Sequence, residues 1–164
     1  MRVLGIDPGT ATTGYGVVEE TAAGLRALAY GAVTTPARQP LALRLQSIFR
    51  ELTALAREWQ PDAAAVEELY FGVNTRTAMS VGQARGVTLL ALAEAGLTIA
   101  EYSPLSVKQA LTGYGGADKR QVQEMIRMLL GLPEIPRPDD AADALAVAVC
   151  HLHSARLRQL EEET

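Results

Sequence analysis

The chain lacks the sequence features of disulfide-bonded, membrane-spanning and secreted proteins. Its single cysteine, Cys150, excludes a disulfide within the 164 residues. No apolar run approaches the roughly 20 residues of a membrane-spanning helix. The first residues also lack the long apolar core and small-residue cleavage site of a signal peptide. We therefore expect a cytoplasmic protein without membrane association, in which Cys150 is a small buried helix residue rather than a nucleophile.

An excess of positive charge is also missing. The formal net charge is −4, which on its own argues against a nucleic-acid partner, because phosphate binding needs Lys and Arg. That argument weakens if the acids gather in a metal site while the bases gather elsewhere, so the distribution of charge decides. Hydrophobic residues make up 48% of the chain, which excludes general disorder. The length suits one domain over residues 1–164, with a frayed tail from about residue 157.

Strand patterns come first along the chain, and helix patterns follow. Three β-type runs with turn residues between them predict an antiparallel meander at about residues 3–7, 15–19 and 25–34. Apolar runs indicate further strands near residues 63–67 and 97–102, the first covered on both faces as in a parallel sheet. Periodicity and end signals predict helices at about 41–59, 75–95, 104–111, 118–131 and from 139 past 153. This order predicts an α/β fold, a sheet with helices on its faces.

Acidic residues stand at the ends of two apolar strands. Asp7 ends the first strand, where an ionised carboxylate is costly unless a cation or strong hydrogen bonds compensate it. The doublet Glu67 and Glu68 ends a later strand. Adjacent strand residues face opposite sides, so at most one of the two joins a common site. Spacing alone leaves that choice open, along with the simpler alternative of an exposed strand end.

A second group of acids begins the last predicted helix. Asp140 and Asp143 are three residues apart and share a helix face. Capping explains Asp139, which we interpret as a cap, but not Asp143, which lies past the first turn among alanines. Like charges about 4 Å apart repel by roughly 1–4 kcal/mol, and a divalent cation turns that repulsion into coordination. Oxygen ligands alone favour Mg²⁺ or Mn²⁺ over zinc.

Five short motifs follow one another along the chain: Gly5-Ile6-Asp7-Pro8-Gly9, Thr13-Gly14-Tyr15-Gly16, Val66-Glu67, Gly82-Gln83-Ala84-Arg85-Gly86 and Asp140-Ala141-Ala142-Asp143-Ala144-Leu145-Ala146. In this order, and over essentially the whole chain, they resemble the bacterial RuvC Holliday junction resolvases, or crossover junction endodeoxyribonucleases. The resemblance implies one RNase H-like nuclease domain, with a mixed five-stranded sheet flanked by helices on both faces. It also implies a homodimer that cuts four-way DNA junctions symmetrically in homologous recombination and DNA repair, together with the RuvA–RuvB branch-migration complex.

The resemblance also implies the active site. It assigns four acids both as catalytic residues and as metal ligands: Asp7, Glu67, Asp140 and Asp143. It thereby selects Glu67 from the acidic doublet. The implied reaction is Mg²⁺-dependent hydrolysis that leaves a 5′-phosphate and a 3′-hydroxyl, with two ions per site and Mn²⁺ as a substitute. Asp7 is expected to bridge both ions, and Glu67 and Asp143 to hold one each. Asp140 is expected to complete or orient a site.

Six residues are candidate DNA contacts: Tyr70, Phe71, Arg76, Arg85, Lys108 and Lys119. Lys119 begins a helix after a glycine-rich segment, a setting that suits phosphate. The resemblance places Lys108 and Lys119 near the scissile phosphate or the DNA backbone. Arg85 lies on a predicted helix and could serve structure instead. The two aromatic residues could stack on an unpaired base at the junction centre or pack at the strand end, and the sequence leaves both open. We interpret His151 and His153 as structural or surface residues.

Three other functions fit parts of the sequence. Sugar-kinase or actin-like ATPases also carry an Asp-x-Gly turn, but they need two such lobes and this chain has the length for one. A junction-binding module that does not cleave is disfavoured by the full set of acids, which hinder DNA binding unless a metal is bound. A general RNase H-like RNA nuclease is disfavoured by the ordered motifs, although the fold alone would not separate it.

Overall fold

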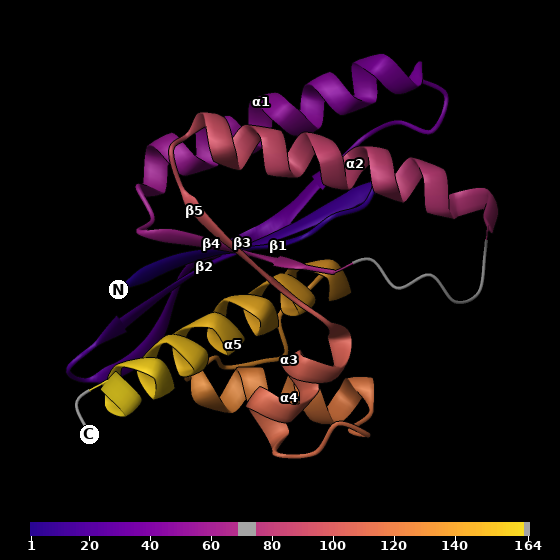
Figure 1. The fold of residues 1–164 in the computed structure, drawn as a ribbon. Coiled ribbons are helices and arrows are strands. Elements are labelled where there is room, and N and C mark those ends of the chain that lie inside the picture. Colours follow the sequence, from indigo (N-terminus) through magenta and orange to yellow (C-terminus); the bar gives the residue numbers. More distant parts are fainter. Residues whose placement is uncertain (69–74, 163–164) are drawn as a thin grey trace.

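The computed structural model describes residues 1–68 and 75–162, with the backbone alone for residues 75, 76, 159 and 162. Within these residues, five strands form one sheet in the order β3-β2-β1-β4-β5 (Figure 1). β1 (Arg2–Asp7), β2 (Thr12–Thr21) and β3 (Gly24–Thr34) are antiparallel neighbours. β4 (Ala63–Glu67) and β5 (Thr98–Tyr102) run parallel to β1. The predicted mixed five-stranded sheet is confirmed.

Helices cover both faces of this sheet (Figure 1). α1 (Leu41–Trp59) and α2 (Thr75–Glu94) lie side by side over one face. On the other face α5 (Asp139–Glu162) crosses β1 and β2, with α3 (Pro104–Thr112) and α4 (Lys119–Leu129) packed against it. Alternate β1 side chains pack against the helices on the two faces of the sheet, because successive strand residues face opposite sides. Leu4 and Ile6 pack in the α1–α2 core, and Val3 packs in the α5 core.

α5 confirms the helix that was predicted from residue 139 past residue 153. It is helical to Glu162, so most of the tail expected to fray from about residue 157 continues the helix. The segment from 155 to 162 reads Ala-Arg-Leu-Arg-Gln-Leu-Glu-Glu, and these are all good helix formers that can extend an existing helix. Among the described residues, no helix has the length and apolar character needed to cross a membrane.

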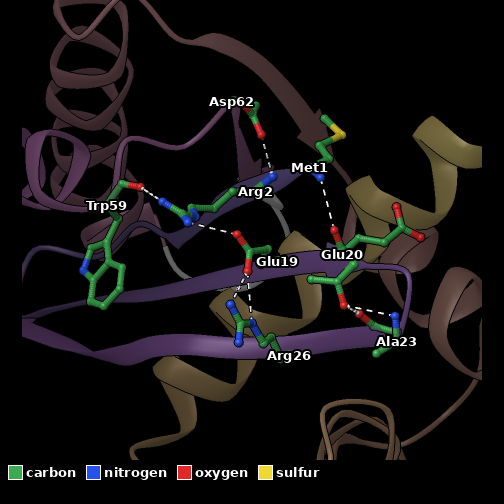
Figure 2. A network of polar contacts seen from close by, with 10 residues as sticks. Met1, Arg2, Glu19, Glu20, Ala23, Arg26, Trp59 and Asp62 are labelled. Carbon is green, nitrogen blue, oxygen red and sulfur yellow. Dashed lines mark hydrogen bonds and ion pairs between the residues drawn. The ribbon is translucent and has the colours of Figure 1, made fainter.

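The start of β1 is tied to its neighbours by a polar network (Figure 2). The Arg2 backbone N–H donates to Asp62 Oδ2 at 2.7 Å, and its guanidinium donates to the Trp59 carbonyl at 2.5 Å. The same guanidinium pairs with Glu19 of β2 at 2.9 Å, and Glu19 also accepts from Arg26 of β3 at 2.6 Å. These contacts join β1 to β2, to the end of α1 and to the turn before β4. They fix the position of β1 at the end remote from its terminal aspartate.

Candidate active site

Two neighbouring parallel strands bring the first two acids together. β1 and β4 pair in parallel with Ile6 opposite Val66, and the next residues are Asp7 and Glu67. Strands that run the same way end at the same edge of the sheet, where α/β proteins usually place their ligands. The Asp7 and Glu67 side chains lie close enough for each to shift the pKa of the other. Glu68, the other member of the doublet, is exposed.

Glycines let α5 come close enough to add two more acids. A Cβ on Gly14 would lie 1.9 Å from the backbone oxygen of Asp140. A Cβ on Gly5 would lie 2.0 Å from a backbone oxygen one turn further along α5. No side chain can make such contacts, so only glycine allows α5 to lie at this depth on the sheet. At this depth Asp140 and Asp143 both act electrostatically on Asp7. The structure thus brings the four predicted acids into one cluster.

Burial makes Asp7, Glu67 and Asp143 resist ionisation. Burial first, and then the charge of Glu67, raises the pKa of Asp7 to about 9. Burial is also the largest cause that raises the pKa of Glu67 and the pKa of Asp143. The charges of Asp143 and Asp140 push the pKa of Asp7 further in the same direction. Buried acids that repel one another are a good setting for a cation, because its charge compensates theirs.

Lys119, the first residue of α4, supplies positive charge to the cluster. Its Nζ lies 3.2 Å from Asp139 Oδ2 and 3.7 Å from Asp143 Oδ2. Partial burial acts to lower the pKa of Lys119, but attraction to Asp143 and Asp139 outweighs it and raises that pKa above its ordinary value. Asp118 and Gln121 form a capping box, since the side chain of each accepts from the other's backbone N–H. The capping box fixes the start of α4 and so the position of Lys119.

Asp139 does more than begin a helix. It lies in the first turn of α5, where an acid complements the helix dipole. Its side chain also reaches α4, where Gln123 Nε2 donates to Oδ1 at 3.2 Å and Lys119 pairs with Oδ2. The hydrogen bond from Lys119 holds the pKa of Asp139 below its usual range. Asp139 therefore joins α4 to α5 next to the cluster, a contact that spacing along one helix gives no means to predict.

Two hollows of about 230 Å³ each share the side chain of Glu67 in their walls. The first lies toward α3 and α4 and is lined by Glu67, Pro104, Val107, Lys108, Lys119, Val122, Asp143 and Ala146. The second lies toward α2 and is lined by Asp7, Pro8, Glu67, Glu68, Val81, Arg85 and Pro104. The first hollow combines two acids with two lysines. This combination suits a phosphate group held together with a cation.

Arg85 of α2 is bonded to protein groups. Its Nη1 donates to the backbone oxygen of Glu67 at 2.8 Å, and its Nη2 pairs with Glu101 of β5 at 2.5 Å. Only 17% of the Arg85 side chain is exposed. The sequence allowed both a DNA contact and a structural role for Arg85, and these bonds are of the structural kind. Sequence reasoning missed Glu101, because one charged residue on a short strand carries no local signal.

The other predicted residues divide into two groups. Tyr70 and Phe71 lie outside the described residues, and of Arg76 the structure describes only its place in α2. The histidines make hydrogen bonds within the fold: His151 Nδ1 lies 2.9 Å from the Tyr102 hydroxyl, and His153 Nδ1 lies 3.3 Å from the backbone oxygen at position 110. Cys150 is buried, as expected.

The chemistry of the four acids fits a hard divalent cation. They offer carboxylate oxygens, the ligands that Mg²⁺ and Mn²⁺ prefer. Within residues 1–68 and 75–162, however, no three Asp, Glu, His or Cys side chains stand close enough to enclose an ion as they are placed. Asp7 and Glu67 interact with each other, and Asp143 pairs with Lys119.

Comparison with known proteins gives one consistent result. A family model described as "Crossover junction endodeoxyribonuclease RuvC" matches residues 3–151. A relative of that name from Syntrophomonas wolfei is 56% identical over 164 residues, which is 100% of this chain and 95% of the relative. The RuvC structure from Thermus thermophilus superposes with a TM-score of 0.89 at 42% identity, over 96% of each chain. The structure of T. thermophilus RuvC in complex with Holliday junction substrate gives 0.88 at 39% identity, again over 96% of each.

Proposed function

The chain belongs to the RuvC family of crossover junction endodeoxyribonucleases, the Holliday junction resolvases, and from this premise we propose how its own residues carry out the reaction. Residues 1–164 form a single nuclease domain that hydrolyses DNA strands at a four-way junction. One observation carries the proposal. Four carboxylates from β1, β4 and α5 converge beside the hollow that Lys108 and Lys119 line.

We assign Asp7, Glu67, Asp140 and Asp143 as the ligands of Mg²⁺, with two ions per site and Mn²⁺ as a substitute. When bound, the ions would polarise the scissile phosphate and activate a water molecule. The charges of Glu67, Asp143 and Asp140 all act on Asp7, which supports its assignment as the ligand shared by both ions. Glu67 and Asp143 hold one ion each in this proposal, and Asp140 completes or orients a site.

The lysines have a separate task. Lys108 and Lys119 line the hollow beside Glu67 and Asp143, where they can neutralise the phosphate that enters it. Lys119 would exchange its contact with Asp143 for the phosphate, which frees that carboxylate. Water attacks the phosphorus in line with the 3′-oxygen, the P–O3′ bond breaks, and the departing oxygen takes a proton. The products are a 5′-phosphate and a 3′-hydroxyl, and no covalent enzyme intermediate is required.

Further contacts with the junction belong to the same proposal. Tyr70 and Phe71 follow Glu67 closely along the chain, so an aromatic ring there would meet an unpaired base near the cut. Arg76, at the start of α2, would contact the sugar–phosphate backbone of the DNA. These assignments are tested by substituting each residue and measuring the affinity for a four-way junction against that for a linear duplex.

A homodimer follows from the symmetry of the substrate. Two symmetric cuts on a two-fold junction need two active sites related by a two-fold axis. α2 offers a surface for this contact, because Met79 and Leu90 leave 74% and 53% of their area exposed. The RuvA–RuvB branch-migration complex is the further partner that we propose. Co-sedimentation of the chain with RuvA–RuvB on a four-way junction, against the junction alone, tests that part.

The test is a cleavage assay on a synthetic four-way junction labelled at one 5′ end at a time. We expect paired nicks at symmetric positions in Mg²⁺ that a ligase can seal, and none in EDTA or with Asp7→Asn. Linear duplex, single-stranded DNA and an RNA–DNA hybrid of the same sequence serve as control substrates. Tight junction binding without nicks in any divalent ion would support a binding module instead. Equal cleavage of the RNA strand would support a general RNase H-like nuclease.

A further inference from the structure

We propose that Arg85 is a positioning residue for Glu67 and not a DNA contact. The inference rests on the proposed function, because it takes Glu67 to be a metal ligand. It concerns the point at which the chain leaves the sheet. There the orientation of the Glu67 backbone determines where its carboxylate can reach, so whatever fixes this backbone also sets the geometry of the site.

The bonding of Arg85 supports this role. β4 ends at Glu67, and the following N–H, that of Glu68, makes a bond to the Tyr102 carbonyl at 2.8 Å. The Glu67 carbonyl is bonded by Arg85 Nη1 at 2.8 Å. A guanidinium is planar and rigid, so it fixes the direction of a bond as well as its length. Arg85 thus connects α2 to the last residue of β4, beside the hollow that Asp7 and Glu67 share.

Glu101 fixes the other end of the same guanidinium. It lies on β5, where it precedes Tyr102, the residue paired with Glu67 in the sheet. Its carboxylate pairs with Arg85 Nη2 at 2.5 Å. Arg85 therefore links the ends of two adjacent strands, the carbonyl of one and a side chain of the other. A lysine could not span both groups, because its ammonium is a single point of charge on a flexible stem.

Exposure argues against a direct DNA contact. Arg85 leaves 17% of its side chain exposed, whereas Lys119 leaves 56% exposed beside the same cluster. A phosphate at Arg85 would have to compete with Glu101 and would be repelled by its charge. DNA would also have to draw the guanidinium away from the Glu67 carbonyl, which would disturb a catalytic ligand at the moment of reaction. Lys119 carries no such cost, since releasing Asp143 serves metal binding.

The two roles predict opposite effects for Glu101. If Arg85 positions Glu67, then Glu101→Gln weakens the clamp and reduces divalent-ion binding in the same direction as Arg85→Ala. If Arg85 contacts DNA, then Glu101→Gln removes a repulsive charge next to that contact and increases junction affinity. Arg85→Lys separates the roles again, because it keeps the charge and loses the bidentate link.

The experiment measures Arg85→Ala, Arg85→Lys and Glu101→Gln against the wild type. Arg127→Ala is the matched control, since Arg127 is also ion-paired, to Glu124 on its own helix. Isothermal calorimetry with Mn²⁺ reports metal binding by the free protein, and fluorescence anisotropy in EDTA reports junction affinity and its salt dependence. We expect the Mn²⁺ dissociation constant to rise roughly tenfold in all three variants, as for other residues that orient a metal ligand. Junction affinity and its salt slope stay within about twofold of the wild type.

Three results would overturn the proposal. The first is a weaker junction affinity with a smaller salt slope for Arg85→Ala and unchanged Mn²⁺ binding. The second is a Mn²⁺ affinity in Glu101→Gln equal to that of Arg127→Ala, which also decides the matter if Arg85→Ala does not fold. The third is full recovery of Mn²⁺ binding in Arg85→Lys. Since calorimetry uses the free protein, its result stands even if the wild type cleaves no junction, so the two proposals fail separately.

Discussion

The ammonium group of Lys119 lies 3.7 Å from the carboxylate of Asp143, one of the proposed metal ligands. The pair joins the first residue of α4 to the second turn of α5. A lysine in this position balances part of the negative charge of the cluster. It also stands where the negative charge of a phosphate would arrive. The same side chain can therefore stabilise the acids before DNA binds and the phosphate afterwards.

Lys119→Ala should affect both the rate and the pH profile of cleavage. We expect the single-turnover rate to fall roughly 10²-fold, the usual cost of removing one electrostatic contact to the transition state. The Lys119 charge acts to lower the pKa of Asp143, so removal of this charge raises that pKa. The part of the pH–rate profile in which the rate rises with pH should therefore move to higher pH. Arg120→Ala is the matched control, because it removes an equal charge from the next residue. Identical pH profiles for the two variants would contradict this role.

Asp7→Asn should abolish cleavage and change how stability depends on pH. In the folded protein the pKa of Asp7 is raised from 3.8 to about 9, so the folded state keeps a proton that the unfolded state loses. This contribution to stability is fully present below about pH 4 and is lost as the pH rises toward 9. In EDTA, the wild type should lose on the order of a few kcal/mol between pH 5 and 9 through this group. The variant should lose less.

Urea unfolding at both pH values, in EDTA and in Mg²⁺, measures this difference. Mg²⁺ should restore stability to the wild type at pH 9 and should have little effect on Asp7→Asn, because ligand binding stabilises only a state that binds. Asp62→Asn is the control, since Asp62 lies at the other end of β1 and asparagine keeps the oxygen that accepts from Arg2. A wild type that is equally stable at pH 5 and 9 in EDTA would refute the prediction.

Gly14→Ala should separate α5 from the sheet. Its Cβ would lie 1.9 Å from the Asp140 backbone oxygen, a contact that only backbone movement can relieve. We expect a loss of about 2–3 kcal/mol in the free energy of unfolding, with weaker Mn²⁺ binding as Asp140 moves away. Gly31→Ala on β3 is the matched control, because the three atoms nearest to its Cβ belong to the Tyr15 side chain, whose ring can shift. Calorimetry with Mn²⁺ and urea unfolding check both variants, and equal effects would contradict the prediction.

Leu90→Asp should dissociate the proposed homodimer. Leu90 on α2 leaves 53% of its area exposed, and burying an unpaired charge in an interface opposes association. Leu157→Asp is the matched control, because Leu157 leaves 62% of its area exposed and belongs to α5, the helix that covers the other face of the sheet. Sedimentation equilibrium should give a monomer for the first variant and a dimer for the second. The monomer should lose paired cutting of the junction and keep its Mn²⁺ affinity. If the Leu90→Asp variant remained a dimer, α2 would be excluded as the dimer interface.

The local properties of the sequence were enough for much of the fold and for most of the candidate acids, but only the family resemblance selected Glu67 over Glu68. Apolar runs that end in Asp7 and Glu67 predicted two buried strands with costly charges at their ends, because burial of an unpaired carboxylate has a high energetic price whatever the fold. The spacing of Asp140 and Asp143 predicted one helix face. End signals predicted a helix from about residue 118, and α4 begins there with a capping box, whose two hydrogen bonds involve residues three apart.

Only the tertiary structure decided which groups meet across elements. Three sets of contacts join residues that are remote in sequence. They are the contact of Lys119 with Asp143, those of Arg85 with Glu67 and Glu101, and the close approach of Gly14 to Asp140. Charge–charge and steric energies depend on distances of a few ångströms, and these distances are set by how helices and strands pack. The sequence alone therefore indicated that carboxylates at the ends of buried strands need a compensating positive charge. The packing of α2, α4 and α5 decided which basic side chains and which backbone atoms contact these acids.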